Sequence, residues 1–306
     1  MVNNLGWWGK VNIGIIGAGS TGLLLAASLA KSNHKITMYV RRKTQQRKLQ
    51  HNGVHLRPNG MTSKVDSQMH NELGLQDLYI ICVKQPVLQK NVEGWINQIP
   101  RDKPILFLQN GMSHVDVIAD FEQPIFVGVL DHGAKRVDDY TVEHTGIGEI
   151  RVGIIRKDDE ALAKRVVLQL HEERFPIIFE ENTLHIMKRK LIVNAVINPL
   201  TAMFNVRNGR ILENAHLKAL AKQLCYEACL ALDMDFETHW IYVKQVAKKT
   251  ESNSSSMRED VKQNQQTEVE AITGYLLQLT DQELPYNSFI YHGVQSLSIE
   301  SWNQSD

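Results

Sequence analysis

Cysteine is scarce in this sequence, and that scarcity limits what the chain can be. Its 306 residues include only Cys82, Cys225 and Cys229. Cys225 and Cys229 would share a helix face, but no paired histidine or cysteine motif completes a metal site. An odd and sparse set of this kind is typical of the cytoplasm. We therefore expect a cytoplasmic protein that binds no metal and uses all three thiols for core packing.

The sequence also lacks net charge and long apolar runs. Lys+Arg and Asp+Glu both total 34, so no overall field attracts nucleic acid or anionic lipid. The longest apolar run, Leu23–Ala27 with its flanks, is far shorter than the roughly 20 residues that span a bilayer. The N-terminal extension holds Trp7 and Trp8 but no apolar core of a secretory signal. These properties favour a soluble enzyme with a small-molecule substrate and no nucleic-acid or membrane partner.

A glycine-rich turn near the N-terminus joins a β-rich run, Val11–Ile16, to a buried helical stretch, Leu23–Ala30. The turn reads Gly17-Ala18-Gly19-Ser20-Thr21-Gly22. This is the context that the dinucleotide-binding fingerprint requires, because the three glycines permit a tight turn, close approach to a pyrophosphate, and close packing of helix on strand. The start of the helix favours phosphate charge as well. A glycine-rich turn without a ligand remains the alternative.

Basic residues follow the next predicted strand, Lys35–Val40, where an NAD enzyme would place an acidic residue. Arg41 and Arg42 stand there, with Lys43 behind them. A guanidinium can hold a 2′-phosphate with two parallel hydrogen bonds, whereas a carboxylate would repel it. The sequence therefore favours NADPH over NADH, and a solvated basic helix start is the alternative interpretation.

The second half of the chain contains a polar series on an otherwise apolar helix. Lys190, Asn194 and Asn198 recur at i, i+4 and i+8, which sets them along one side with a drift of about 40° per step. Burying such groups unpaired costs roughly 1–3 kcal/mol each. The series is therefore either a polar seam in a core or the wall of a binding site.

Polar residues also end two predicted strands of the first half. Lys84 follows an apolar strand, and Gln109, Asn110 and Gly111 follow the next one. The carboxyl ends of parallel strands face the ligand crevice, so these side chains are candidates for contacts to cofactor or substrate. A solubilising lysine and an asparagine that only caps its turn are the alternatives.

A further candidate region lies near residue 256. Ser256 and Glu259 fit a capping box, which predicts Ser256 as the N-cap of a helix that runs through Glu268. The same helix start is also a candidate carboxylate site. The 12 residues between Ser256 and Glu268 correspond to about 120° of helical rotation, so the two would not share a face. On spacing alone, Glu268 is a surface residue.

The order of these elements predicts an α/β N-terminal Rossmann-like domain with a mostly parallel sheet, followed by an all-α C-terminal domain. Strand and helix patterns alternate up to about Glu181, with a hairpin at Pro58–Gly60 and single strands that include Lys135–Glu143. Only helical patterns follow. We place the NADP-binding domain at residues 1–182 and the helical substrate and catalytic domain at residues 183–306, with the substrate between them.

Taken together, these segments resemble ketopantoate reductase (2-dehydropantoate 2-reductase) from Val11 to about Leu297. The segments that carry the resemblance, in order, are Gly17–Gly22, Val83-Lys84, Gln109–Met112, Lys190–Ala202, Asn253–Met257 and Thr267–Gly274. The polar helix and the spacing of the Ser-Met and Thr-Glu pairs are its most specific parts. Departures from the family pattern are Ser20 in place of the usual alanine and the segment Lys262–Gln266, which lacks the basic residue common before the Thr-Glu pair. The N-terminal extension, which includes Trp7 and Trp8, is a further departure.

The resemblance implies an NADPH-dependent oxidoreductase of the pantothenate and coenzyme A pathway. It implies that Lys190 is catalytic, that Glu268 is its acidic partner, and that Asn110 lies between nicotinamide and substrate. It further implies cofactor contacts from Arg41 and Lys84 beside the glycine loop, and substrate contacts from Asn194, Asn198, Asn253 and Ser256. A reductase of another 2-oxo acid and a non-catalytic NADP-binding sensor stay open, as does assembly into a homodimer.

Overall fold

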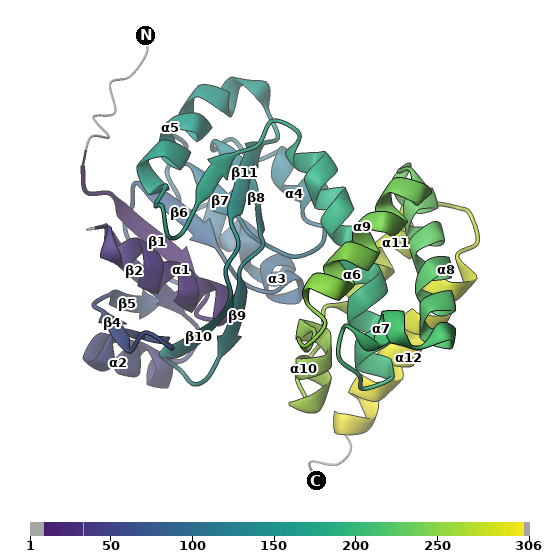
Figure 1. Ribbon diagram of the computed structural model, residues 1–306. Helices are drawn as coiled ribbons and strands as arrows, with labels where there is room; N and C mark the ends of the chain where they lie inside the picture. Colours follow the sequence, from purple (N-terminus) through teal and green to yellow (C-terminus); the bar gives the residue numbers. More distant parts are fainter. Residues whose placement is uncertain (1–8, 33, 303–306) are drawn as a thin grey trace. The chain divides into compact units, whose positions relative to one another are not determined.

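The computed structural model describes residues 9–32 and 34–302, so Trp7 and Trp8 lie outside the described residues. The chain forms two compact units (Figure 1). The first comprises residues 1–109 and 114–183, and the second comprises residues 110–113 and 184–306. In the part of the chain that the structure describes, no helix combines the length and apolar character needed to cross a membrane.

The first unit is built on an eight-stranded sheet with the order β12-β11-β8-β7-β6-β1-β2-β5. Its strands are β1 (Asn12–Ile16), β2 (Lys35–Val40), β5 (Asp66–Met69), β6 (Leu78–Ile81), β7 (Ile105–Phe107), β8 (Ile125–Leu130), β11 (Ile150–Ile154) and β12 (Ile177–Phe179). Neighbouring strands are parallel except β8 and β11, which pair antiparallel. The predicted mostly parallel sheet is therefore confirmed.

Strands β6 and β7 in the middle of the sheet are apolar and buried along their whole length, as expected for a sheet covered by helices. The helices of this unit are α1 (Ser20–Lys31), α2 (Lys43–Asn52), α3 (Gln85–Ile96), α4 (Val115–Ala119) and α5 (Glu160–Leu170), the last preceded by a 3₁₀ turn at Lys157–Asp159. Helix α1 contacts β1 and β2 on one side and a second, smaller sheet on the other. That position explains why α1 is apolar around most of its circumference.

The smaller sheet has the order β4-β3-β10-β9 and consists of β3 (Val54–Arg57), β4 (Met61–Ser63), β9 (Gly133–Arg136) and β10 (Thr141–Gly146). The antiparallel β3–β4 pair confirms the predicted hairpin at Pro58–Gly60. The single strand predicted over 135–143 is wrong, because β9 and β10 form a hairpin there. Asp138 makes the turn by accepting hydrogen bonds from the amides of Tyr140 at 2.9 Å and Thr141 at 2.7 Å.

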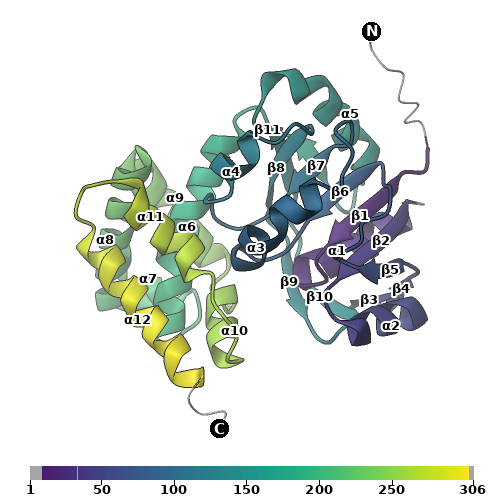
Figure 2. The same cartoon turned by 180° about the vertical axis from the view of Figure 1, so that it is seen from behind.

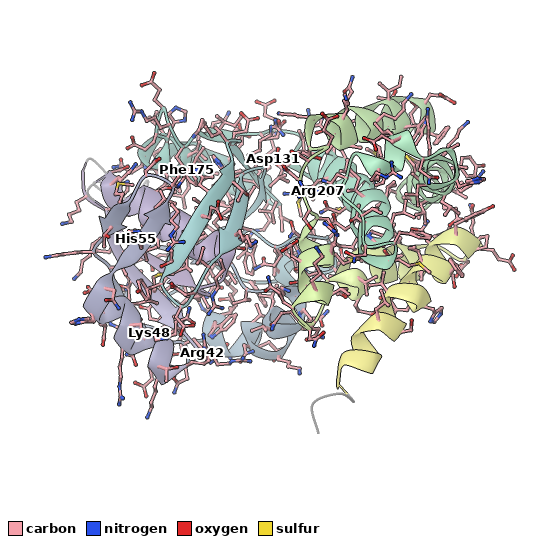
Figure 3. The ribbon with its side chains drawn as sticks, turned by 60° about the horizontal axis from the view of Figure 1, so that its bottom comes forward. Arg42, Lys48, His55, Asp131, Phe175 and Arg207 are labelled. Atoms are coloured by element: carbon pink, nitrogen blue, oxygen red, sulfur yellow. The ribbon has the colours of Figure 1, made fainter. Side chains whose placement is uncertain are left out.

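A histidine pair lies in the first unit beside the end of β8, with His132 buried and His144 half-buried. Nδ1 of His132 lies 3.0 Å from Nε2 of His144, and its ring stacks on Phe175 with centroids 4.3 Å apart. Figure 3 labels Phe175 and also Asp131, the residue before His132. Burial and the neighbouring His144 lower the pKa of His132 to about 4. The pair is therefore neutral at physiological pH.

The second unit is helical, and no strand occurs among its described residues. Its elements are α6 (Thr183–Met203), α7 (Arg210–Glu213), α8 (Ala215–Leu232), α9 (Phe236–Lys249), α10 (Ser256–Lys262), a π-helical turn (Glu270–Gly274), α11 (Tyr275–Leu279) and α12 (Pro285–Trp302). Helix α12 packs against α8 (Figure 2). The α/β and all-α division of the fold is confirmed, whereas the division of function between residues 1–182 and 183–306 remains a prediction.

Candidate functional site

The glycine loop has the geometry of a tight strand-to-helix turn. Gly17 has a φ of +108°, and a Cβ at Gly22 would lie 1.9 Å from the carbonyl oxygen of Gly17. The loop is held to the sheet because the Gly17 amide donates a 3.0 Å hydrogen bond to the carbonyl of Tyr39 in β2. Helix α1 begins at Ser20, three residues before the predicted start, so Ser20 and Thr21 belong to its first turn.

The start of α1 offers room for an anion. Gly19 is the N-cap of α1; among the described residues, no side chain caps this helix and no atom lies within 4 Å of where a Cβ at Gly19 would be. Amides in the first helical turn have no intrahelical acceptor, and together with the helix dipole they favour a phosphate. The residues present therefore fit the pyrophosphate of a dinucleotide.

The basic residues after β2 take different positions. Arg41 and Arg42 are both exposed, and Arg42 forms an ion pair with Asp139 of the β9–β10 turn. Arg41 lies near His70, where its charge adds to burial in lowering the pKa of that imidazole. Lys84 is the N-cap of α3 and is exposed at the end of the loop after β6.

The loop after β7 is held by two contacts that the sequence does not reveal. The buried Gln109 amide donates to the carbonyls of Ile81 at 2.9 Å and Val83 at 3.2 Å. Gly111 has a φ of +82°, and a Cβ there would lie 2.4 Å from the carbonyl oxygen of Ala271 in the π-helical turn. Only glycine allows this close approach, and it places Asn110 beside the same segment.

Asn110 and Glu268 are brought together. Nδ2 of Asn110 donates a 3.1 Å hydrogen bond to Oε2 of Glu268, whose residue is only 9% exposed. The interpretation of Glu268 as a surface residue is therefore wrong. Its basis fails because α10 ends at Lys262, so no single helix connects Ser256 to Glu268. Glu268 instead stands two residues before the π-helical turn, a deviation often found at functional sites.

The predicted polar series lies on α6, as expected. Lys190 and Asn194 are half-buried and Asn198 is 9% exposed, while the residues between them are buried apolar side chains. No side-chain hydrogen bond of Asn194 or Asn198 to another described residue is present. A polar seam in a core would pair these amides with each other or with neighbouring groups. The arrangement therefore favours the wall of a binding site.

The start of α10 differs by one residue from the prediction. Ser255, not Ser256, is the N-cap, and its hydroxyl accepts a 3.1 Å hydrogen bond from the Arg258 amide. Three consecutive serines precede Met257, so the capping pattern alone could not select the right one. Ser256 is left exposed at the first helical position, which frees its hydroxyl from the capping role.

Thr201 is a functional-site candidate that the sequence does not reveal, and its partner is Ser255. Both are buried, and the Thr201 hydroxyl lies 2.6 Å from Oγ of Ser255. The same hydroxyl contacts the carbonyls of Ile197 at 2.7 Å and Asn198 at 3.1 Å. This bridge ties the α6 turn that carries Asn198 to the start of α10, where Ser256 lies. The position of Thr201 one turn after Asn198 is the only signal that could have found it.

Asn253 lies in the exposed loop before α10, where its main chain is paired. Its amide donates to the carbonyl of Thr250 at 2.8 Å, and its carbonyl accepts from the amide of Asn208 at 3.1 Å. The loop is therefore fixed relative to α9, and the side chain of Asn253 extends from an ordered backbone.

The side chains of Cys82 and Cys225 lie in environments that keep their thiols protonated. All three cysteines are free thiols. Burial raises the pKa of Cys82, and a hydrogen bond with Cys229 together with burial raises that of Cys225. A raised pKa keeps a thiol protonated and unreactive, in keeping with core packing. Among the described residues, no cluster of His, Cys, Asp and Glu is placed to hold a metal ion.

The fold and these residues define a two-unit, dinucleotide-dependent oxidoreductase, in which an α/β unit carries the glycine loop and a helical unit carries the lysine, the amides and the buried carboxylate. Two family models match the chain: ketopantoate reductase PanE/ApbA over residues 13–157, and its C-terminal region over residues 182–298. The chain belongs to the ketopantoate reductase family.

Individual relatives cover nearly the whole chain. The 2-dehydropantoate 2-reductase of Bacillus subtilis is 37% identical over 294 residues, which include 94% of this chain and 97% of the relative. That of Listeria monocytogenes is 34% identical and covers 95% and 98%. A crystal structure described as a probable 2-dehydropantoate 2-reductase panE from Bacillus subtilis has a TM-score of 0.83 at 36% identity, covering 94% of this chain and all of the other.

A more distant relative shares the fold. D-mandelate dehydrogenase in a ternary structure with NADH and anilino(oxo)acetate has a TM-score of 0.88 at 21% identity, and the match covers 95% of this chain and 99% of that one. At that identity the likeness shows only that the two proteins have the same fold.

Proposed function

We propose that this chain is an NADPH-dependent 2-dehydropantoate 2-reductase that reduces ketopantoate to pantoate in pantothenate biosynthesis. The observation that carries the proposal is the similarity over 94% of the chain to the 2-dehydropantoate 2-reductase of Bacillus subtilis, at 37% identity. The site geometry supports it, because the second unit holds a lysine, a buried carboxylate, and two amides that have no side-chain partner among the described residues.

The glycine loop from Gly17 to Gly22 is the proposed pyrophosphate site. Arg41 and Lys84 contact the rest of NADPH from the ends of β2 and β6. Support comes from the space at Gly19 and from the exposure of both basic side chains. When bound, NADPH supplies the hydride for the reaction. Asn110 is the proposed residue between the nicotinamide and the substrate.

Asn194, Asn198, Asn253 and Ser256 are the proposed substrate-binding residues. Ketopantoate carries a carboxylate, a 2-oxo group and a hydroxyl, which together need several hydrogen-bond donors and acceptors. Asparagine amides and a serine hydroxyl supply both kinds of group, and fixing several polar atoms orients the reacting carbon. The Thr201–Ser255 bridge supports this assignment, because it fixes the helix turn of Asn198 to the first residues of α10.

Lys190 is the proposed general acid. Its ammonium donates a hydrogen bond to the 2-oxo oxygen of the substrate and then transfers a proton, which completes the alcohol after the hydride has reached carbon. Glu268 is the proposed acidic partner of Lys190. The hydrogen bond from Asn110 fixes one Glu268 oxygen, so the orientation of this carboxylate is set before substrate arrives.

A homodimer in the cytoplasm is the proposed state of the protein. The structural relative from Staphylococcus aureus, 20% identical with a TM-score of 0.79, is described as a dimeric ketopantoate reductase. The cytoplasmic location remains a prediction from the sparse cysteines.

The deciding experiment measures initial rates of NADPH oxidation with ketopantoate, pyruvate, 2-oxoisovalerate and 2-oxoisocaproate. We expect kcat/KM for ketopantoate to exceed the others by about tenfold or more, equivalent to about 1.4 kcal/mol of transition-state binding. Faster turnover of another acid would reassign the substrate. No measurable NADPH oxidation with any of the four acids, despite measurable NADPH binding, would contradict the catalytic proposal.

A further inference from the structure

Three cations from different elements of the first unit converge on one carboxylate. Asp139, in the turn between β9 and β10, has a side chain that is only 11% exposed. It accepts contacts from Arg42 at the end of β2, from Lys48 of α2 at 2.9 Å, and from Arg136 of β9 at 2.6 Å. Figure 3 shows Arg42 and Lys48 close together at one end of the unit.

This cluster adjoins the glycine loop through a single side chain. Gln45, buried in the first turns of α2, donates from Nε2 to the carbonyl of Ala18 at 3.0 Å and to the carbonyl of Asp139 at 2.9 Å. The carbonyl of Asp139 and the carbonyl of Ala18 in the proposed pyrophosphate site therefore accept hydrogen bonds from the same nitrogen atom. The cluster occupies the region where a 2′-phosphate follows the pyrophosphate in a dinucleotide-binding unit.

The three cations around Asp139 together carry more positive charge than the one carboxylate neutralises, and Arg42 has more N–H donors than Asp139 uses. Partial burial raises the pKa of Asp139, but the hydrogen bonds and charges of Lys48 and Arg42 outweigh it and lower the pKa to about 2. Against that one negative charge stand three cations. Only one nitrogen of Arg42 contacts Asp139, and a guanidinium has five N–H donors. With side chains 45% and 52% exposed, Arg42 and Lys48 remain accessible to a ligand.

We propose that Asp139 is a positioning residue for cofactor selectivity, whose carboxylate holds Arg42 and Lys48 beside the glycine loop to receive the 2′-phosphate of NADPH. The inference rests on the proposed function. Three like charges at this distance repel one another, and long side chains lose conformational freedom when a ligand immobilises them. The Asp139 carboxylate reduces the repulsion between the cations and already orders Arg42 and Lys48 before the cofactor binds.

The test compares direct binding of NADPH and NADH to the wild type, Asp139→Asn and Asp138→Asn. In Asp139→Asn we expect the Kd for NADPH to rise about five- to tenfold, the scale of leaving one or two long side chains unordered. The Kd for NADH should change less than about twofold, and kcat at saturating NADPH should be unchanged. A loss of folded protein would affect both cofactors equally, so their Kd ratio is insensitive to folding.

Asp138→Asn is the matched control. It removes one negative charge at the neighbouring position, where the Asp138 carboxylate accepts hydrogen bonds from the amides of Tyr140 and Thr141 and from the Thr141 side chain. Asparagine can accept the same bonds, so this variant should keep the wild-type ratio of the two Kd values. A parallel fall of selectivity in both variants would mean that net charge, rather than anchoring by Asp139, is responsible, and would overturn the inference.

Two further results would also overturn it. Equal weakening of NADPH and NADH in Asp139→Asn would assign Asp139 a purely structural role in the turn. Tighter NADPH binding in that variant would mean that Asp139 competes with the phosphate for the cations. A wild type without preference for NADPH would instead refute the cofactor part of the proposed function, and that result is visible before any variant is made.

Discussion

Gly111→Ala is the substitution whose effect can be worked out most fully from the structure. A Cβ at this position would lie 2.4 Å from the carbonyl oxygen of Ala271, about 1 Å closer than an ordinary van der Waals contact. The φ of +82° adds roughly 1–2 kcal/mol of strain for any residue with a Cβ. The obstacle is a backbone atom, so the loop itself must move by about 1 Å.

That movement acts on the adjacent Asn110. Its hydrogen bond to Glu268 is 3.1 Å long and would exceed hydrogen-bonding distance after such a shift. A misplacement of about 1 Å at a reacting centre can cost about 10²-fold in rate. We therefore expect Gly111→Ala to lower kcat for ketopantoate by roughly 10- to 100-fold, with a smaller loss of stability.

The assay is steady-state NADPH oxidation together with thermal unfolding. Gly94→Ala is the control, because Gly94 lies in α3 and a Cβ there would meet nothing within 4 Å. That variant should keep wild-type kcat and gain about 0.5–1 kcal/mol in helix stability. If Gly111→Ala retained kcat within about threefold while folded, the proposed dependence of catalysis on the Asn110–Glu268 contact would be refuted.

Three other predictions concern the helical unit and acid stability. Lys190→Ala should lower kcat by roughly 10²–10⁴-fold while the Kd for NADPH stays the same; a near-normal rate would remove Lys190 from the mechanism. Asn198→Ala should mainly raise KM for ketopantoate in initial-rate measurements, and an unchanged KM would show that the polar face of α6 is structural. The pKa of His132 is lowered to about 4 in the folded protein, so as the pH falls the unfolded chain binds a proton at this histidine before the folded chain does. Its contribution to stability is complete above about pH 6.5 and is lost as the pH falls towards about 4; urea unfolding of the wild type should show that loss, and His132→Gln should reduce it.

Much of the architecture could be predicted because local chemistry determined it. The glycine spacing between Val11–Ile16 and the following helix constrains the backbone so closely that strand, turn and helix appear as predicted, apart from an earlier helix start. The polar series on α6 was visible for a similar reason, because helical periodicity alone places Lys190, Asn194 and Asn198 on one side.

Features that depend on tertiary contacts could not be predicted. The pairing of Asn110 with Glu268 joins residues 158 positions apart, and no periodicity reports such a contact. The same holds for Asp139, whose three partners lie on separate elements and whose turn was predicted as the middle of a strand. At the start of α10, three serines offered equally good caps, and only the packing of Thr201 against Ser255 selects one.

Residues 110–113 belong to the helical unit although the chain on both sides of them belongs to the α/β unit. The polypeptide therefore passes from one unit to the other three times, and the helical unit is not contiguous in sequence. Exchange of helical units between family members by a single crossover at residue 183 would pair the π-helical turn of one parent with the Asn110–Gly111 loop of the other. A functional chimera therefore needs residues 110–113 to come from the same parent as the helical unit. Recombination within this family is thus constrained at residues 110–113 as well as at the boundary near residue 183.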